Sequence, residues 1–322
     1  MTTSPGPKES PLVSVVILSW NRKDDLALSL ATVEEVSYPQ LEIIVVDNAS
    51  TDGTAEMVEN KYPKVKLILL PRNIGVEGFN VGYLNARGKY ILALDDDSYP
   101  HPDAVSELVK KMEIDENIAV IGAKIINPRD GKVCTKGPES YEIPYTSFWG
   151  GGALLRRKAV IECGMYDHRL FVYTNEYDLS VRLLEAGYSV TYDPSVVIYH
   201  AFSPVARFSK TKWYWGRNEI WFNLRYMPLR YLPITLPRSF MWMLMLSRHS
   251  VKEMCYQILG MLNGFLSFPY SERKPVKKDL AILLLRNHWT FVPPIKFIYN
   301  YLSRKAVSQF SGETESTSTL PK

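Results

Sequence analysis

The sequence has few of the features that mark a secreted or disulfide-stabilised protein. Its 322 residues include 3 cysteines, Cys134, Cys163 and Cys255, and their wide spacing gives neither a disulfide framework nor the spacing of a metal site. Such cysteine usage is typical of a reducing compartment. The N-terminal segment "MTTSPGPKES" is polar and has no apolar core, so we expect no signal peptide and a cytoplasmic location.

The C-terminal part is short of acidic residues and of long apolar runs. Residues 201–322 contain 18 Lys and Arg against 6 Asp and Glu, a balance of +12, whereas residues 1–200 contain 20 against 28, a balance of −8. Within the aromatic-rich stretch 226–249, the longest charge-free run is 239–247, far shorter than the ~20 apolar residues of a membrane-spanning helix. The basic balance suits nucleic acid, anionic lipid or a phosphorylated ligand. The aromatic residues predict either the core of a helical tail or an interfacial membrane contact.

Short apolar runs alternate with amphipathic stretches along most of the chain. The runs predict strands, and the stretches between them predict helices, with a helical region beyond residue 205. This alternation favours an α/β protein with a mostly parallel central sheet in three layers and a C-terminal helical extension. The expected strands are residues 12–20, 41–50, 64–70, 89–94, 117–122, 189–192 and 196–199, and the expected helices are 23–34, 50–62, 77–88, 102–113 and 175–188.

Three polar residues follow directly on expected strands. Asn21 comes after the first, Asp47 lies at the end of the second, and Asp95 comes after the fourth. In a parallel sheet, ligands bind beyond the carboxyl ends of the strands. The sequence therefore predicts that these three side chains share one rim, and that this rim is a binding site.

The run "LALDDDSYP" places three carboxylates side by side at the end of a buried strand. Their mutual repulsion raises their pKa values and destabilises the fold unless a cation offsets it. In a D-x-D pattern, Asp95 and Asp97 lie on one side of a turn, where a hard divalent cation finds oxygen ligands. We therefore predict a Mg²⁺ or Mn²⁺ site. The alternative is a solvated turn that caps a helix starting near Pro102.

Two enzyme classes use a D-x-D at a strand end. In phosphatases of the haloacid dehalogenase type the first aspartate, here Asp95, is the nucleophile. In nucleotide-sugar glycosyltransferases the pair holds the metal that bridges the diphosphate. The local pattern leaves both open, although in the phosphatases the motif usually lies on an early strand.

The motifs "VSVVILSWNR", "IIVVDNASTDGT", "NIGVEGFNVG", "LALDDDSYP", "GGALLRRKAVIECGMYD", "NEYDLSVRLLEAGY" and "VIYH" follow one another in this order. With them the sequence resembles inverting glycosyltransferases of family 2, which have the GT-A fold, and among these the rhamnosyltransferase-like enzymes of bacteria and archaea. The resemblance covers residues 11–225. The remainder is expected to be a disordered N-terminus (1–10), a helical, basic and aromatic extension (226–305) and a disordered tail (306–322).

The resemblance implies a metal-dependent hexosyl- or rhamnosyltransferase of cell-surface polysaccharide or glycolipid synthesis. The donor would be a UDP- or dTDP-sugar, and the acceptor a hydroxyl of a glycan or a lipid-linked glycan. We expect no nucleic-acid partner, and we hypothesise peripheral contact of the C-terminal helices with the anionic inner face of the cell membrane. The rival interpretations are an aspartyl phosphatase or phosphotransferase at Asp95 and a non-catalytic glycosyltransferase scaffold.

The resemblance also implies roles for individual residues. Asp95 and Asp97 form the metal pair together with His200, a ligand type that suits Mn²⁺. The base that deprotonates the acceptor hydroxyl lies in the family in an acidic motif that opens a helix; here Asn175 replaces its first acid and Glu176 occupies the position of the base. Asp178 is the alternative base. The expected donor contacts are Ser19, Trp20, Asn21, Asp47, Asn73, Gly75, Asn80, Asp95, Asp96 and Arg217, and the expected sugar contacts are Trp149, Gly151 and Gly152.

Overall fold

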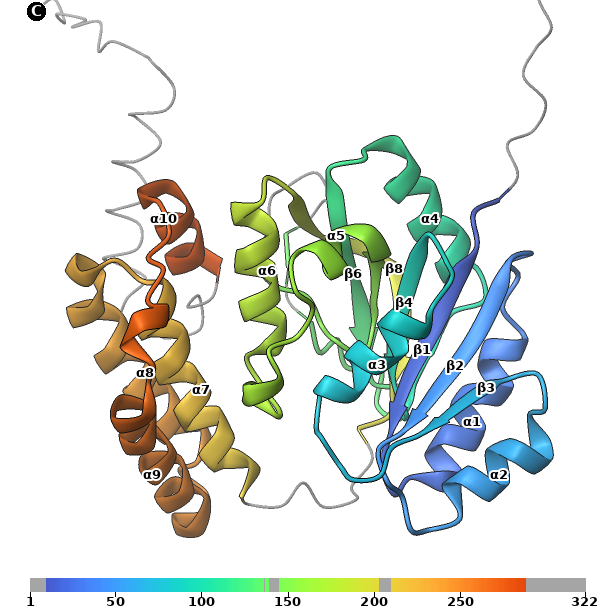
Figure 1. Ribbon diagram of the computed structural model, residues 1–322, viewed down its shortest axis with the longest axis horizontal. Helices are drawn as coiled ribbons and strands as arrows, with labels where there is room; N and C mark the ends of the chain where they lie inside the picture. The colour runs from blue at the N-terminus through green and yellow to red at the C-terminus, as the bar shows by residue number, and fades with distance from the viewer. Residues whose placement is uncertain (1–9, 136, 139–144, 203–209, 288–322) are drawn as a thin grey trace, which may run out of the picture.

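The computed structural model describes residues 10–135, 137–138, 145–202 and 210–287. A central sheet with helices on both faces is followed by a separate group of C-terminal helices, and α6 (Asn175–Glu185) lies between the two (Figure 1). The expected α/β class with a C-terminal helical extension is confirmed. The predicted disordered ends and the last part of the extension lie outside the described residues.

The sheet of the described residues has eight strands in the order β3-β2-β1-β4-β7-β6-β8-β5. Parallel pairing joins β1 to β2 and β4, β2 to β3, and β6 to β8. The strand bounds are β1 Val13–Ser19, β2 Leu41–Asp47, β3 Lys66–Leu69, β4 Tyr90–Asp95, β5 Ser98–Pro100, β6 Ile118–Ile126, β7 Ala153–Arg156 and β8 Ser189–His200.

Two hydrophobic clusters lie on opposite faces of the sheet. One packs α1 (Lys23–Glu34), α2 (Thr54–Lys61) and α4 (Ala104–Ile114) against the strands, and the other packs α3 (Glu77–Asn85), α5 (Arg157–Glu162) and α6. Because helices cover both faces, the central strands β1 and β4 are apolar on both sides and buried along most of their length. This explains why the strands appear in the sequence as continuous apolar runs.

Two strands depart from the predicted parallel sheet. The strand β7 is antiparallel to β4 and β6, and the short β5 is antiparallel to β8. The sheet is therefore mixed, and its parallel pairings outnumber the antiparallel ones by only four to three. The two strands predicted at 189–192 and 196–199 form one strand, β8, whose register against β6 shifts at Ala123 and Lys124.

The C-terminal helices form a group with two small cores of their own. The group consists of α7 (Thr211–Tyr226), α8 (Leu232–Leu246), α9 (Val251–Ser267) and α10 (Lys278–Asn287). Glycines bring α7 and α9 unusually close: a Cβ added to Gly260 would lie 2.1 Å from the carbonyl oxygen of Trp213, and one added to Gly216 would lie 2.3 Å from that of Gln257. The charge-free run 254–271, longer than the one noted above, thus belongs mainly to a helix packed on α7.

Among the described residues, no helix combines the length and the apolarity that crossing a bilayer requires. Of the aromatic residues in the stretch 226–249, Tyr226 is buried in one of the two small clusters, whereas Phe240 is 41% exposed. Apolar side chains also remain exposed on α8 and α9, among them Met241 and Leu266.

The close approach of α7 and α9 makes Gly260→Ala a test of their packing. Alanine normally stabilises a helix relative to glycine, but here its methyl group meets a backbone carbonyl that cannot move away. We expect the free energy of unfolding to fall by about 1–3 kcal/mol, measured by urea denaturation. Leu259→Ala, at an exposed position next to it, should change it by no more than about 0.5 kcal/mol. A stabilised Gly260→Ala protein would contradict the packing.

Candidate active site

The carboxyl ends of β1, β2 and β4 lie at the same level of the sheet. In the register of the strands, Ser19 is opposite Asp47, and Leu18 is opposite Asp95. The predicted common rim is therefore present. The antiparallel pairing of β5 with β8 sets Ser98 opposite His200, which brings the histidine beside the acidic run.

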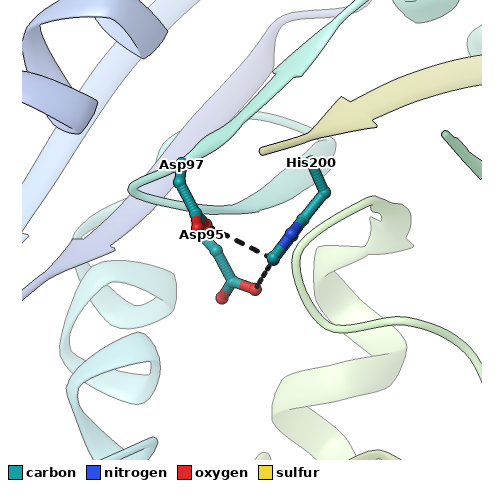
Figure 2. A group of neighbouring side chains, drawn as sticks. All are labelled: Asp95, Asp97 and His200. Atoms are coloured by element: carbon teal, nitrogen blue, oxygen red, sulfur yellow. Dashed lines mark hydrogen bonds and ion pairs between the residues drawn. The ribbon is translucent and has the colours of Figure 1, made fainter. Parts of the chain in front are cut away.

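Asp95, Asp97 and His200 converge at this rim (Figure 2). The imidazole Nε2 of His200 lies 3.1 Å from Asp95 Oδ2 and 3.3 Å from Asp97 Oδ1. One potential ligand atom from each residue lies within 4.8 Å of the others. Asp97 and His200 are buried, whereas the side chain of Asp95 is 36% exposed, so the cluster opens to solvent on the Asp95 side.

The donor set of this cluster fits a divalent cation. Two carboxylates and an imidazole are ligands that Mn²⁺ accepts and Mg²⁺ tolerates. The backbone N–H of Phe202 donates to His200 Nδ1, which assigns the ring proton to Nε2, where it faces both carboxylates. A cation bound to Nε2 would replace that proton. The neutral ring would then carry its proton on Nδ1, which could no longer accept the hydrogen bond from the N–H of Phe202.

Arg22 is a cationic side chain in contact with the acidic run. Its guanidinium lies 3.2 Å from Asp96 and 2.9 Å from Asp97. Arg22 therefore offsets part of the negative charge of the run, and a divalent cation would offset more of it. The sequence analysis missed Arg22, although its place one residue after Asn21 at the end of β1 put it on the predicted rim.

Asp96 points toward β1 rather than toward Asp95. Its Oδ2 accepts hydrogen bonds from Ser19 Oγ (3.2 Å) and from the backbone N–H of Trp20 (3.3 Å). Burial raises the pKa of Asp96 to about 7, with added repulsion from its two neighbours, although Arg22 opposes the shift. Asp96 and Ser19, both predicted as donor contacts, thus also hold the end of β1 to the end of β4.

The loops after β1 and β2 are joined to one another. Asn21 Oδ1 accepts from the backbone N–H of Thr51 at 2.7 Å, and the N–H of Asn21 donates to Ser50 Oγ at 2.9 Å. Asp47 is buried, and its Oδ1 accepts from the N–H of Ser50 at 2.9 Å. Trp20 is 37% exposed beside these residues. The two loops therefore form one edge of the rim, as the donor-site prediction requires.

Glu176 and the acidic run lie on either side of two consecutive glycines, Gly150 and Gly151. A Cβ on Gly150 would lie 2.5 Å from Glu176 Oε1, and a Cβ on Gly151 would lie 2.3 Å from Asp95 Oδ2. The pKa of Glu176 is raised to about 7, mainly by burial and further by repulsion from Asp95, against hydrogen bonds that include one from the Gly150 N–H. A carboxyl group with this pKa can accept a proton near neutral pH.

Asp178 is not arranged as a base. Its Oδ1 accepts from Tyr226 Oη (2.7 Å) and Arg225 Nη1 (3.1 Å), and its Oδ2 accepts from Arg182 Nε (3.1 Å) and Nη2 (2.7 Å). The carboxylate is also buried. Four donors occupy both oxygens, so Asp178 serves to join α6 to α7, and Glu176 remains the candidate base.

The predicted glycine-rich segment packs mainly on protein. Asn80 exchanges two hydrogen bonds with the backbone of Tyr166, and Asn73 Oδ1 accepts from the N–H of Gly75 at 2.8 Å. A Cβ on Gly75 would lie 2.1 Å from the carbonyl oxygen of Phe171. The glycine at this position permits close contact with the turn before α6.

Of the remaining predicted residues, Trp149 lies at the cluster, whereas Gly152 and Arg217 contact other parts of the protein. Trp149 packs edge-on against His200, with the ring centroids 5.8 Å apart, so it lies at the cluster. Gly152 packs against Ile125 in the core. Arg217 contacts Trp221 (4.8 Å to the ring centroid) and the carbonyl oxygen of Arg169, so the conformation seen here turns it toward α7 and the turn before α6.

Comparison with known proteins gives consistent matches. Residues 14–171, just under half of the chain, match the family model described as glycosyl transferase family 2. The uncharacterised glycosyltransferase YfnE of Bacillus subtilis is 25% identical over 254 residues, which cover 59% of this chain and 65% of that protein. Poly-β-1,6-N-acetyl-D-glucosamine synthase of Staphylococcus aureus is 24% identical over 202 residues, which cover 56% of this chain and 48% of the synthase.

A solved structure extends the match beyond the first half of the chain. The mannosyltransferase PcManGT of Pyrobaculum calidifontis, in complex with GDP-Man and Mn²⁺, aligns with a TM-score of 0.55 and 19% identity over 96% of this chain and 90% of that one. The chain therefore has the GT-A fold that the motifs predicted. It spans between about a third and two thirds of the length of the first curated relatives it matches.

Removal of Arg22 tests the charge balance of the rim. Arg22→Gln removes the guanidinium that pairs with Asp96 and Asp97, so we expect the metal-free protein to lose about 3–5 kcal/mol of stability. Added Mn²⁺ should raise the melting temperature of this variant more than that of the parent. Arg87→Gln, which removes an exposed partner of Glu42, should cost at most about 1 kcal/mol. Equal stability of the Arg22→Gln protein and its parent without metal would contradict the charge balance.

Proposed function

Since residues 14–171 match the model of glycosyl transferase family 2, we propose that the protein transfers a sugar, with inversion, from a nucleoside-diphosphate donor to an acceptor hydroxyl. The observation that carries this proposal is the glycine pair Gly150–Gly151, which sets Glu176 against one end of the acidic run. A carboxylate base and a cluster suited to a cation thus lie on either side of two residues without side chains.

The donor would lie along the rim formed by β1, β2 and β4. Asp47 can accept from the N3–H of uracil or thymine, and Trp20 and Asn21 border the same edge, which favours a UDP- or dTDP-sugar. Asp95, Asp97 and His200 would hold Mg²⁺ or Mn²⁺, and the Mn²⁺ in the complex of the Pyrobaculum enzyme supports this. When bound, the cation would offset negative charge on the leaving diphosphate.

The acceptor would enter on the side of Glu176. With a pKa of about 7, Glu176 is a carboxylate in a large fraction of molecules at neutral pH and can take the proton of an attacking hydroxyl. That attack on the anomeric carbon, from the side opposite the leaving diphosphate, inverts the configuration. The glycines at 150 and 151 let the backbone pack directly against Glu176 and Asp95, and Trp149 lies beside His200.

The nature of the acceptor is the finer part of the proposal. The relative from Staphylococcus aureus is a polysaccharide synthase, which supports a glycan or lipid-linked acceptor and a hexosyl- or rhamnosyltransferase type. The exposed apolar side chains of α8 and α9, with the basic residues Arg230, Arg248 and Lys252 among them, would allow peripheral contact with an anionic membrane surface.

The alternatives make different use of the same residues. A phosphatase would form a covalent aspartyl phosphate on Asp95, and the family match gives it no support. A non-catalytic scaffold was suggested by Asn175 in place of an acid, but a half-buried carboxyl group at Glu176 with a pKa raised to about 7 favours catalysis.

A thermal-shift panel tests the donor site. UDP, dTDP and GDP, and sugars attached to each, would be added with Mn²⁺, Mg²⁺ or EDTA. A ligand at 100-fold excess over its Kd adds about 2.7 kcal/mol of stability. We expect a shift for a pyrimidine nucleotide that needs the cation and disappears in Asp97→Asn. Shifts that persist in both EDTA and the variant would contradict the site.

Glu176→Gln tests the base with the donor that the panel identifies. We expect kcat to fall about 10²–10⁴-fold, while the thermal shift by the donor stays close to that of the parent. In the parent, kcat/KM should rise with pH through about 7, because the carboxyl group of Glu176 must lose its proton to act as a base. Glu185→Gln, an exposed change on the same helix, should alter neither. Unchanged turnover in Glu176→Gln would rule out this base.

Flotation with liposomes tests the membrane contact. We expect salt-sensitive binding to vesicles that contain anionic lipid, and little binding to neutral vesicles. Replacing the exposed Leu262 and Leu266 of α9 with serine should weaken it, whereas Leu84→Ser, an equally exposed position on α3, should not. Failure of the parent protein to float with anionic vesicles would count against peripheral membrane contact.

A further inference from the structure

The turn that leads into the helix of Glu176 has an unusual backbone. Phe171, Tyr173 and Thr174 have φ angles of 58°, 65° and 67°. Residues with side chains rarely adopt this left-handed region, and a run of them persists only when the surroundings hold it in place. Gly75 also packs against the turn, and the N–H of Val76 donates to the carbonyl oxygen of Phe171 at 2.7 Å. Something other than local preference must therefore fix this segment.

Asn218 of α7 supplies that constraint. Its side-chain Nδ2 donates to the carbonyl oxygens of Leu170 (2.8 Å), Val172 (2.8 Å) and Tyr173 (3.1 Å). An amide nitrogen has two hydrogens, so two of the three carbonyls share one. Asn218 is fully buried, and its Oδ1 accepts from the side chain of Arg217. The whole carboxamide is thus used to hold the turn.

Aromatic stacking fastens the same turn to the start of α7. The ring of Phe171 stacks on Tyr214 with centroids 4.8 Å apart, and the ring of Tyr173 stacks on Trp215 with centroids 5.0 Å apart. At the other end of α7, Arg225 and Tyr226 bind Asp178, two residues beyond Glu176. Contacts with α7 therefore precede and follow Glu176 along the chain.

We propose that Asn218 is a positioning residue for the carboxylate of Glu176, acting through the turn 170–174. This rests on the proposed function in one respect only, that Glu176 is the base. Because the turn is held against its backbone preference, loss of the three hydrogen bonds lets it relax toward ordinary φ angles. The start of α6 then moves, and Glu176 leaves its half-buried position beside Gly150 and Asp95.

A matched pair of variants separates positioning from plain stability. Asn223 lies on the same helix and is also fully buried, but its Nδ2 donates to Glu219 and Ser239, within the C-terminal helices. Asn218→Ala and Asn223→Ala both remove a buried amide whose Nδ2 donates three hydrogen bonds, although among the described residues only Oδ1 of Asn218 also accepts one. Both should lower the melting temperature, but only the first removes bonds to the turn.

The carboxyl ¹³C resonances of the glutamates, titrated by NMR in the full-length protein without ligand, report on Glu176 directly. Glu176→Gln assigns its resonance. We expect a pKa near 7 in the parent and in Asn223→Ala, and a fall of about one unit or more in Asn218→Ala, because a relaxed turn exposes the carboxyl group to water. An unchanged pKa in Asn218→Ala, or equal shifts in the two variants, would overturn the proposal.

Turnover of the donor found in the panel gives a second readout. We expect kcat to fall about 10²-fold in Asn218→Ala, the cost of a misplaced reacting group, with little change in the donor KM; an unchanged kcat would overturn the proposal. If Asn218→Ala does not fold, Trp215→Leu, at a half-buried ring, should shift the pKa of Glu176 in the same direction by a smaller amount. Full turnover in Glu176→Gln would refute the base, whereas the NMR titration would still decide whether Asn218 positions Glu176.

Discussion

The organisation of the site depends on the repulsion among three carboxylates at the end of β4. Asp96 turns toward β1, where Ser19 and the backbone of Trp20 donate to it, and Arg22 bridges it to Asp97. The third carboxylate, Asp95, is left to face His200 and the open side of the rim. Arg22 offsets part of this negative charge, and a divalent cation held by Asp95, Asp97 and His200 would offset more of it. We therefore expect a cation bound at this cluster to stabilise the rim as well.

The same charges act on Glu176. Asp95 and burial together raise its pKa to about 7, which suits a base that must release its proton to solvent and take one from a hydroxyl. This shift depends on the carboxyl group staying close to Gly150, and the position of Gly150 depends in turn on the strand β7 that follows it. On the other side, the strained turn before α6 is held by α7. The C-terminal helices, whatever surface they contact, thus form part of the active-site framework.

Much of the fold could be predicted because it depends on local patterns. The apolar runs gave β1, β2 and β4, and the strand-end positions of Asp47 and Asp95 placed both on the rim. The antiparallel β7 and the short β5 could not be predicted, because their pairing depends on contacts far along the chain. The roles of Asn80 and Asp178 needed the structure for the same reason: their partners, Tyr166 and the side chains of α7, are distant in sequence.

The central claim is that Asp95, Asp97 and His200 bind a divalent cation. Anomalous diffraction at the manganese edge, from crystals grown with Mn²⁺ and a nucleoside diphosphate that binds in the thermal-shift panel, measures this most directly. We predict one strong peak in contact with Asp95 or Asp97 and with the diphosphate, and with His200 turned so that Nε2 faces it. A diphosphate bound along the rim with no manganese peak at the acidic run would contradict it.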